Sequence, residues 1–321
     1  MKYGTIRGIK KPVSRIAQGT IMISRAKLDE SFRLLDAAFE GGCNMFDTAH
    51  CYGEDNERLP GEWIKSRGIR DKVVMLAKGA HPDGGGKRCN PKDITEQLTQ
   101  SLERMQFDYI DLYVLHRDDP AVPAKEIVDC LNEHHAAGRI HAFGGSNWTY
   151  ERLKEANEYA EANGLVPFAV SSPNFSLAIS HKPMWGDCVS IQGPDGADAR
   201  EWYARTNMAL VTWSSIARGF FSGRFRTAEE EKKNEILEAC ARDAFCYPDN
   251  FERLGRVYEL ADERGMTVPQ VALAYVLNYP LDIFALVGAC TPEEFGQNLA
   301  ALELALTPEE MAWLNLEADA R

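Results

Sequence analysis

The stretch VVMLAK, residues 73–78, is a run of apolar side chains that ends on a lysine. Two further runs have the same form: NMFD at 44–47 ends on an aspartate, and YIDLYVL at 109–115 is followed by a histidine. Short apolar runs separated by segments of helical periodicity predict buried parallel strands joined by helices. Because all strands of a parallel barrel open their carboxyl ends on one face, we expect these three polar residues to share one mouth.

The rest of the chain repeats this pattern. Apolar residues recur at helical spacing over 28–42, 91–105 and 149–163, and further strands are expected near 13–18, 142–147, 168–172, 209–214 and 284–288. The composition has no break, so residues 1–321 are predicted to form one domain, a (β/α)8 TIM barrel. The Gly- and Pro-containing stretch 177–196 is expected to be a long loop over the carboxyl-terminal mouth, and 227–243 a charged helix.

The composition narrows the class of protein. The formal charge is −12, from 36 basic and 48 acidic residues, which argues against nucleic acid or an anionic membrane as a partner. The eight cysteines form no Cys-x-x-Cys, and His-Glu-x-x-His is absent, so no metal site is predicted. Scattered thiols and the lack of an apolar leader or an 18-residue apolar run predict a soluble cytoplasmic protein.

Four polar residues have the chemistry of a proton-transfer site: Asp47, Tyr52, Lys78 and His116. A lysine ammonium near a phenol lowers the pKa of that phenol, and a carboxylate keeps the ammonium charged. We therefore expect Tyr52 to be a general acid, supported by Lys78 and Asp47, with His116 orienting the substrate oxygen or sharing in the proton relay. Each residue also has an ordinary structural explanation, as a loop cap, a packing residue, a surface strand end or a core histidine. Their joint placement at consecutive strand ends favours the site.

Four segments carry a resemblance to a known family. They are FDTAHCYG at 46–53, LAKG at 76–79, DLYVLH at 111–116 and RIHAFGGSN at 139–147. Together they resemble the aldo-keto reductase superfamily, over about residues 13–303. The resemblance implies hydride transfer between NAD(P)H and a carbonyl compound, with Tyr52 as the acid.

The resemblance also implies a coenzyme site. Trp213 would stack on the nicotinamide, Ser146 and Asn147 would hold its carboxamide, and Ser172 stands where the family commonly has glutamine. The pyrophosphate would lie along the segment after Trp213. The coenzyme residues expected on these grounds are Gly19, Thr20, Ser146, Asn147, Ser172, Trp213, Ser214, Ile216, Arg218, Gly219, Gly288, Cys290, Glu294, Gln297 and Asn298.

The adenosine end of that site departs from NADP-preferring relatives. Residues 288–298 contain no lysine or arginine to pair with a 2′-phosphate, and they do contain Glu294. Thr291-Pro292-Glu293-Glu294 also has the pattern of a helix N-cap, which is a structural explanation for Glu294. We expect NADH to be accepted, with at most a weak preference for NADPH.

The substrate is weakly encoded. The residues expected at the mouth are Ile21, Met22, His81, Arg117, Trp148 and Trp185, and this mixed lining suits a sugar or another polar carbonyl compound. Two alternatives stay open from the sequence. One is a coenzyme-binding regulatory subunit like the barrel subunits of potassium channels. The other is a Schiff-base lyase with Lys78 as its nucleophile. The oligomeric state is not predicted.

Overall fold

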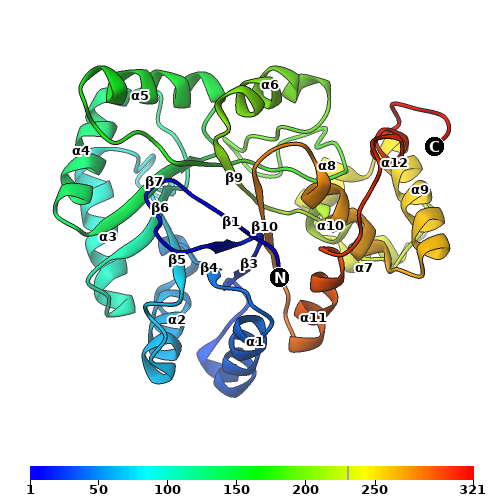
Figure 1. Ribbon diagram of the computed structural model, residues 1–321, viewed down its shortest axis with the longest axis horizontal. Helices are drawn as coiled ribbons and strands as arrows, with labels where there is room; N and C mark the ends of the chain where they lie inside the picture. The colour runs from blue at the N-terminus through cyan, green and yellow to red at the C-terminus, as the bar shows by residue number, and fades with distance from the viewer. Residues whose placement is uncertain (230) are drawn as a thin grey trace.

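The computed structural model describes residues 1–229 and 231–321. Eight parallel strands close into a barrel, in which neighbours along the chain pair and the last strand pairs with the first (Figure 1). The strands are β3 (Ile16–Gly19), β4 (Met45–Asp47), β5 (Val74–Gly79), β6 (Ile110–Leu115), β7 (Ile140–Ser146), β8 (Val170–Ser172), β9 (Ala209–Thr212) and β10 (Ile283–Val287). The predicted (β/α)8 TIM barrel is confirmed.

Helices surround the barrel in an outer ring (Figure 1). Those in the described part of the chain are α1 (Leu28–Glu40), α2 (Glu54–Arg67), α3 (Pro91–Met105), α4 (Ala124–Ala136), α5 (Tyr150–Ala162), α6 (Ala197–Thr206), α7 (Lys232–Ile236), α8 (Ala239–Phe245), α9 (Pro248–Arg264), α10 (Val268–Asn278), α11 (Pro292–Ala300) and α12 (Pro308–Leu314). The three helices predicted individually are confirmed as α1, α3 and α5. Their ends match local signals, since Asn90 caps α3 and Thr149 caps α5 through side-chain oxygens. No helix among the described residues has the length and hydropathy needed to span a membrane.

Two predicted elements differ from the structure. The helix expected over 227–243 is instead two short helices, α7 and α8, and residue 230 lies outside the described residues. The break falls at Leu237, which is extended (φ −96°, ψ 132°) and only 2% exposed. The backbone turns there because it buries this apolar side chain in an otherwise charged segment.

The strand expected near 13–18 is likewise divided. Val13–Ser14 forms β2, which pairs with β1 (Tyr3–Gly4) in an antiparallel hairpin, and the barrel strand β3 begins at Ile16. This hairpin crosses the amino-terminal end of the barrel (Figure 1). Ile6, Ile9 and Val13 pack there into the same apolar cluster as the residues inside the barrel.

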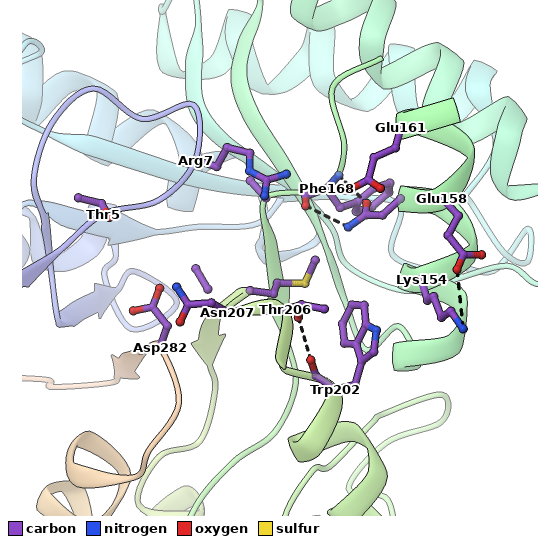
Figure 2. Close-up of a pocket in the computed structure, with 14 residues that line it drawn as sticks. Thr5, Arg7, Lys154, Glu158, Glu161, Phe168, Trp202, Thr206, Asn207 and Asp282 are labelled. Carbon is purple, nitrogen blue, oxygen red and sulfur yellow. Dashed lines mark hydrogen bonds and ion pairs between the residues drawn. The ribbon is translucent and has the colours of Figure 1, made fainter. Parts of the chain in front are cut away.

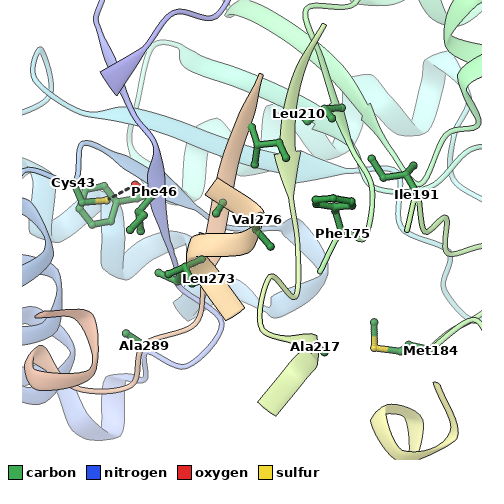
Figure 3. Packing of buried hydrophobic residues seen from close by; sticks show 14 of the residues in the cluster. Cys43, Phe46, Phe175, Met184, Ile191, Leu210, Ala217, Leu273, Val276 and Ala289 are labelled. Carbon is green, nitrogen blue, oxygen red and sulfur yellow. Dashed lines mark hydrogen bonds between the residues drawn. The ribbon is translucent and has the colours of Figure 1, made fainter. Parts of the chain in front are cut away.

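The core has two layers. The inner layer fills the barrel with side chains from alternate strand positions, among them Met45, Leu76 and Val114. The outer layer lies between the strands and the helices, where Leu273 and Val276 of α10 point toward the sheet near Leu210 of β9 (Figure 3). A filled barrel interior leaves only the ends of the strands for chemistry.

Candidate active site

The predicted catalytic residues form the next inward layer above the apolar filling. Asp47 follows Met45 by two positions, Lys78 follows Leu76, and His116 follows Val114. Because strand side chains alternate with a period of two, each polar residue continues the inward face of its strand at the carboxyl end. The same step leads from Val170 to Ser172 and from Val211 to Trp213. Strand geometry therefore gathers residues from distant parts of the sequence at one mouth.

Asp47 and Lys78 form a buried ion pair. The Lys78 ammonium donates to Asp47 Oδ1, and the two side chains are 6% and 4% exposed. Parallel pairing of β4 with β5 places Asp47 opposite Leu76, one inward step from Lys78. Burial raises the pKa of Asp47, and the charge of Lys78 with its hydrogen bond opposes that rise. The pair holds a cation in a site of low dielectric, where its position is fixed by its partner.

Tyr52 lies beside this pair, at the end of the 3₁₀ turn His50–Tyr52. The Lys78 Nζ is 5.8 Å from the centroid of the Tyr52 ring. Burial raises the pKa of Tyr52, Asp47 adds to the rise, and the cations that oppose it are Arg117 and Arg218. The sequence predicts that Lys78 lowers this pKa. In the structure the Lys78 ammonium instead forms an ion pair with the Asp47 carboxylate. Tyr52 therefore stays protonated over the neutral range.

His116 completes the group of four. Its ring meets the Tyr52 ring edge to face at 6.0 Å and the His81 ring at 4.8 Å between centroids. Burial lowers the pKa of His116 well below its usual range, and Lys78, Arg117 and His81 lower it further. The imidazole is consequently neutral at physiological pH. Its Nδ1 lies 3.5 Å from the sulfur of Cys51, a residue that the sequence analysis had not singled out.

Ser146, Asn147 and Ser172 meet where β7 and β8 end. Ser146 Oγ donates to the carbonyl oxygen of Ser172 at 2.9 Å. Asn147, in a left-handed conformation (φ 58°), donates through Nδ2 to the His116 carbonyl at 3.2 Å and accepts from the Val189 amide at 3.1 Å. The Ser172 hydroxyl is buried and has no hydrogen-bond partner among the described residues. It is thus a polar group available to a bound amide.

The segment after β9 makes the other side of the mouth. Ser214, Ala217, Arg218 and Gly219 all have positive φ, between 48° and 91°. Consecutive residues in such conformations turn backbone N–H groups toward one side, which suits an anion. Arg218 lies over the ring of Trp185 at 4.8 Å and is paired with Glu238 at 2.8 Å.

Trp213 and Trp185 also meet at this side, with 6.0 Å between ring centroids. Trp185 belongs to the 177–196 segment, so the contact confirms that this loop reaches the mouth. Asn174, just before the loop, pairs through its backbone with Ser190 of the loop and with Trp213. The buried Trp213 Nε1 has no partner among the residues that the structure describes.

The adenosine-side residues lie at β10 and α11. Thr291 caps α11 as predicted, whereas the Glu294 carboxylate accepts from the Cys290 amide at 2.7 Å, one residue before the N-cap whose amide a capping box would use. Burial raises the pKa of the Cys290 thiol, Glu294 adds to the rise, and Arg224 opposes it. Arg224, which lies outside the 288–298 segment, is thus a cation whose charge acts at Cys290.

The remaining coenzyme candidates lie along the same side. Gly19 is the last residue of β3, Gly288 directly follows the paired strand β10, and Met22 lies over Gly288. The Thr20 hydroxyl is engaged, since it donates to the Asp47 carbonyl at 2.9 Å. In α11 the Gln297 carbonyl accepts from Gln270 at 3.1 Å. Ile216 precedes the 3₁₀ turn Ala217–Gly219, and Asn298 lies near the end of α11.

Most of the residues expected at the mouth reach it. Ile21 and Trp185 are 55% and 40% exposed, and His81 lies against His116. Arg117 is largely buried and donates to the His116 carbonyl at 2.8 Å. Trp148 is a correction: it has no exposed surface and packs against Phe168 in the core.

The position of Trp148 has a local cause. A Cβ on Gly145 would come within 2.7 Å of the Trp148 ring, so this glycine makes room for the indole beneath the strand ends. The ring packs beside Phe168 and Arg152, and the buried indole Nε1 has no hydrogen-bond partner among the described residues.

A cavity of about 580 Å³ lies at the opposite end of the barrel. Arg7, Lys154, Trp202 and Asp282 line it, between α5, α6 and the amino-terminal segment (Figure 2). None of the four catalytic candidates borders it, so this cavity is separate from the site. Among the described residues no cluster of His, Cys, Asp and Glu has the arrangement of a metal site.

Comparisons with known proteins show the family of the chain. The sequence model of the "Aldo/keto reductase family" matches residues 15–315. The probable aryl-alcohol dehydrogenase AAD4 of Saccharomyces cerevisiae is 28% identical over 298 residues, which cover 89% of this chain and 87% of that protein. Norsolorinic acid reductase of Aspergillus flavus is 28% identical over 292 residues, which cover 88% and 69%.

The fold is found in solved structures as well. The glycerol dehydrogenase AKR11B4 from Gluconobacter oxydans superposes with a TM-score of 0.79 at 24% identity, covering 97% of this chain and 93% of that one. At this identity the likeness bears on the fold alone. The family match, which spans nearly the whole chain, bears on its chemistry. The chain belongs to the aldo/keto reductase family and is an NAD(P)-dependent oxidoreductase of carbonyl compounds and alcohols.

Proposed function

We propose that the chain reduces a small aldehyde or ketone, with Tyr52 as the general acid. The observation that carries the proposal is the buried Asp47–Lys78 ion pair beside the Tyr52 ring, at the carboxyl ends of neighbouring strands. A carbonyl oxygen gains negative charge as hydride reaches its carbon, so a nearby proton donor and a fixed cation stabilise the transition state. Tyr52 gives the proton, and Lys78 supplies the cation.

The coenzyme-side residues fit a nicotinamide dinucleotide. A reduced nicotinamide, when bound, supplies the hydride. Trp213 offers its ring face, and the unpartnered Ser172 hydroxyl offers a hydrogen bond to the carboxamide. Asn147 is already engaged on both ends of its amide, and the Ser146 hydroxyl donates to the Ser172 carbonyl, so the Ser172 hydroxyl is better placed for this contact than either.

The pyrophosphate has a matching surface in residues 214–219. Positive φ values along this segment and the half-exposed Arg218 provide N–H donors and a cation. Because Arg218 pairs with Glu238 at an exposed site, exchanging that partner for a phosphate costs little.

For the coenzyme itself we propose that NADH is accepted. Glu294 brings a carboxylate to the adenosine side, where it repels a 2′-phosphate. Arg224 is the opposing charge, so the choice between the two coenzymes depends on the balance of these two residues.

For the substrate we propose a carbonyl compound that carries polar groups, either a sugar or a substituted aromatic aldehyde. Trp185 offers a flat apolar face at the mouth, while His81 and Arg117 are polar. Two relatives are named for similar compounds, one as a probable aryl-alcohol dehydrogenase and one as a norsolorinic acid reductase.

A direct assay tests the proposal. Purified protein is given NADH or NADPH with panels of sugar aldehydes and aromatic aldehydes, and coenzyme oxidation is followed by absorbance. We expect turnover with at least one panel, and a loss of about 10²-fold in the Tyr52→Phe variant. If the coenzyme binds and no aldehyde is reduced, the proposal fails and the regulatory alternative gains. Covalent trapping of Lys78 by borohydride with a carbonyl substrate would instead revive the lyase alternative.

A further inference from the structure

His116 has two ring nitrogens with different surroundings. Nδ1 lies 3.5 Å from the Cys51 sulfur, within the range of a sulfur hydrogen bond. Nε2 has no hydrogen-bond partner among the described residues, although Tyr52 and His81 pack against the ring. A neutral imidazole carries one proton, and the partner of one nitrogen decides which tautomer forms. Cys51 is therefore the residue placed to make that choice.

The protonation states of both groups fit a thiol donor. The lowered pKa of His116 keeps its ring neutral at physiological pH. Cys51 is an exposed residue, yet desolvation of its sulfur by the surrounding atoms raises the pKa of the thiol to about 11, with Lys78 and Arg117 opposing. A thiol that keeps its proton has a hydrogen to donate, and the neutral Nδ1 is an acceptor.

We propose that Cys51 is a positioning residue whose thiol donates to Nδ1 of His116 and so leaves the ring proton on Nε2. The Nε2–H then becomes a second hydrogen-bond donor at the mouth, beside the Tyr52 hydroxyl. This inference rests on the proposed function for its catalytic meaning, because two donors to one oxygen are useful only when that oxygen gains charge. Cys51 comes directly before Tyr52. The same 3₁₀ turn therefore carries the proposed acid and the residue that sets the tautomer of His116.

Nitrogen NMR reads the tautomer without any turnover. Protein labelled with ¹⁵N in histidine is compared with a His116→Asn variant, which identifies the His116 signals among the seven histidines. We expect Nδ1 to be unprotonated and Nε2 protonated in the unchanged protein and in Cys51→Ser. In Cys51→Ala the two tautomers should mix or reverse. A proton on Nδ1 in the unchanged protein, or the same tautomer in Cys51→Ala, would overturn the proposal.

Kinetics give an independent reading. In Cys51→Ala we expect kcat for carbonyl reduction to fall roughly three- to tenfold, the range of one net hydrogen bond, while the KM for the coenzyme is unchanged. Cys51→Ser should recover most of the loss, because its hydroxyl is also a donor. Cys246→Ala, at a thiol far along the chain between α8 and α9, is the matched control and should leave kcat unchanged. Serine behaving like alanine would contradict the donor role.

The two readings also separate this proposal from the proposed function. If no aldehyde is reduced but Cys51→Ala changes the tautomer, the positioning contact stands and the reaction is wrong. If aldehydes are reduced and the tautomer is indifferent to Cys51, the reaction stands and the positioning role is wrong.

Discussion

The two sides of the barrel mouth are built in different ways. On the side of β4 to β6, Asp47, Lys78 and His116 lie on or directly after regular strands, Tyr52 lies on the 3₁₀ turn that follows β4, and the central pair, Asp47 and Lys78, is almost completely buried. On the side of β9 and β10, the groups lie on loops with positive φ, and the main ion pair, Arg218 with Glu238, is exposed. We call these the strand side and the loop side.

The difference shows which side of the mouth holds its side chains at fixed distances and which side can change its charges without loss of the fold. Proton transfer requires fixed distances, and strands that pair on both edges provide them. Coenzyme recognition relies on charged, flexible side chains at the protein surface. One substitution there changes the balance of positive and negative charge without disturbing the core. We therefore expect substitutions on the strand side to be costly and substitutions on the loop side to tune the enzyme.

The largest effect is expected from breaking the buried pair. Lys78→Met leaves the Asp47 carboxylate buried without a counter-ion, and we expect the free energy of unfolding to fall by about 3–5 kcal/mol. Urea unfolding measures this change. On the loop side, Arg218→Ala breaks an exposed pair and should cost less than about 1 kcal/mol.

A second substitution separates charge from packing. Adding Asp47→Asn to Lys78→Met removes the isolated charge, so most of the lost stability should return while activity does not. Equal losses from Lys78→Met and Arg218→Ala would break the comparison between the two sides.

The next effect concerns turnover. Tyr52→Phe removes one hydroxyl, and we expect carbonyl reduction to fall by about 10²-fold with the fold and coenzyme affinity retained. Tryptophan fluorescence during coenzyme titration measures the affinity. Lys78→Met should lose activity to a similar extent, and the double variant little more, because residues that act as one unit are not additive. A product of the two separate losses would show that the residues work independently.

The raised pKa of Tyr52 predicts a pH dependence that differs between the two reaction directions. Reduction uses the protonated phenol, which persists because burial raises the pKa above its usual value of about 10; its rate should be flat from about pH 6 to pH 9. Alcohol oxidation needs the phenolate, so its rate should rise about tenfold for each pH unit over the same interval.

A substitution of Arg117 tests the link between the pKa of Tyr52 and the rate of alcohol oxidation. The Arg117 guanidinium opposes the rise in the pKa of Tyr52, so Arg117→Ala should raise that pKa further and slow oxidation at any given pH. A reduction rate that falls off near neutral pH would show that the pKa is lowered in the working enzyme, as the sequence first suggested.

The smallest effect is expected on the loop side, in coenzyme choice. Glu294→Arg replaces a repelling carboxylate by a phosphate partner, and we expect the NADPH/NADH ratio of kcat/KM to rise roughly tenfold, for about 1.4 kcal/mol of contact. Arg224→Ala is the counterpart and should lower the same ratio. Because Glu294 also accepts from the Cys290 amide, the variant is expected to lose about 1 kcal/mol of unfolding free energy. Thermal unfolding is therefore measured together with the kinetics. A hundredfold preference for NADPH in the unchanged enzyme would contradict the NADH proposal.

The strand side could be predicted from the sequence because its signals are local. A short apolar run that ends on a polar residue fixes both the strand and the direction of its last side chain. Helix caps are equally local: the side chains of Asn90 and Thr149 accept from backbone amides three residues further along the chain.

The loop side could be predicted only in outline. Neither the contact of Trp185 with Trp213 nor the approach of Arg224 to Cys290 has a local signal, because each joins segments that are far apart in the chain. The burial of Trp148 was missed for a different reason. Gly145 was interpreted as part of a motif, whereas the missing side chain of this glycine also leaves space for the indole.

The hairpin of β1 and β2 has one more consequence. It seals the amino-terminal end of the barrel with Ile6, Ile9 and Val13, which join the apolar filling of the interior. Every molecule that reaches Tyr52 must therefore enter and leave at the carboxyl-terminal mouth, past Trp185 and the Arg218 segment. A departing product and an arriving substrate therefore compete for one opening. We expect residues of the loop side to control the rates of binding and release, while the strand side carries out the reaction.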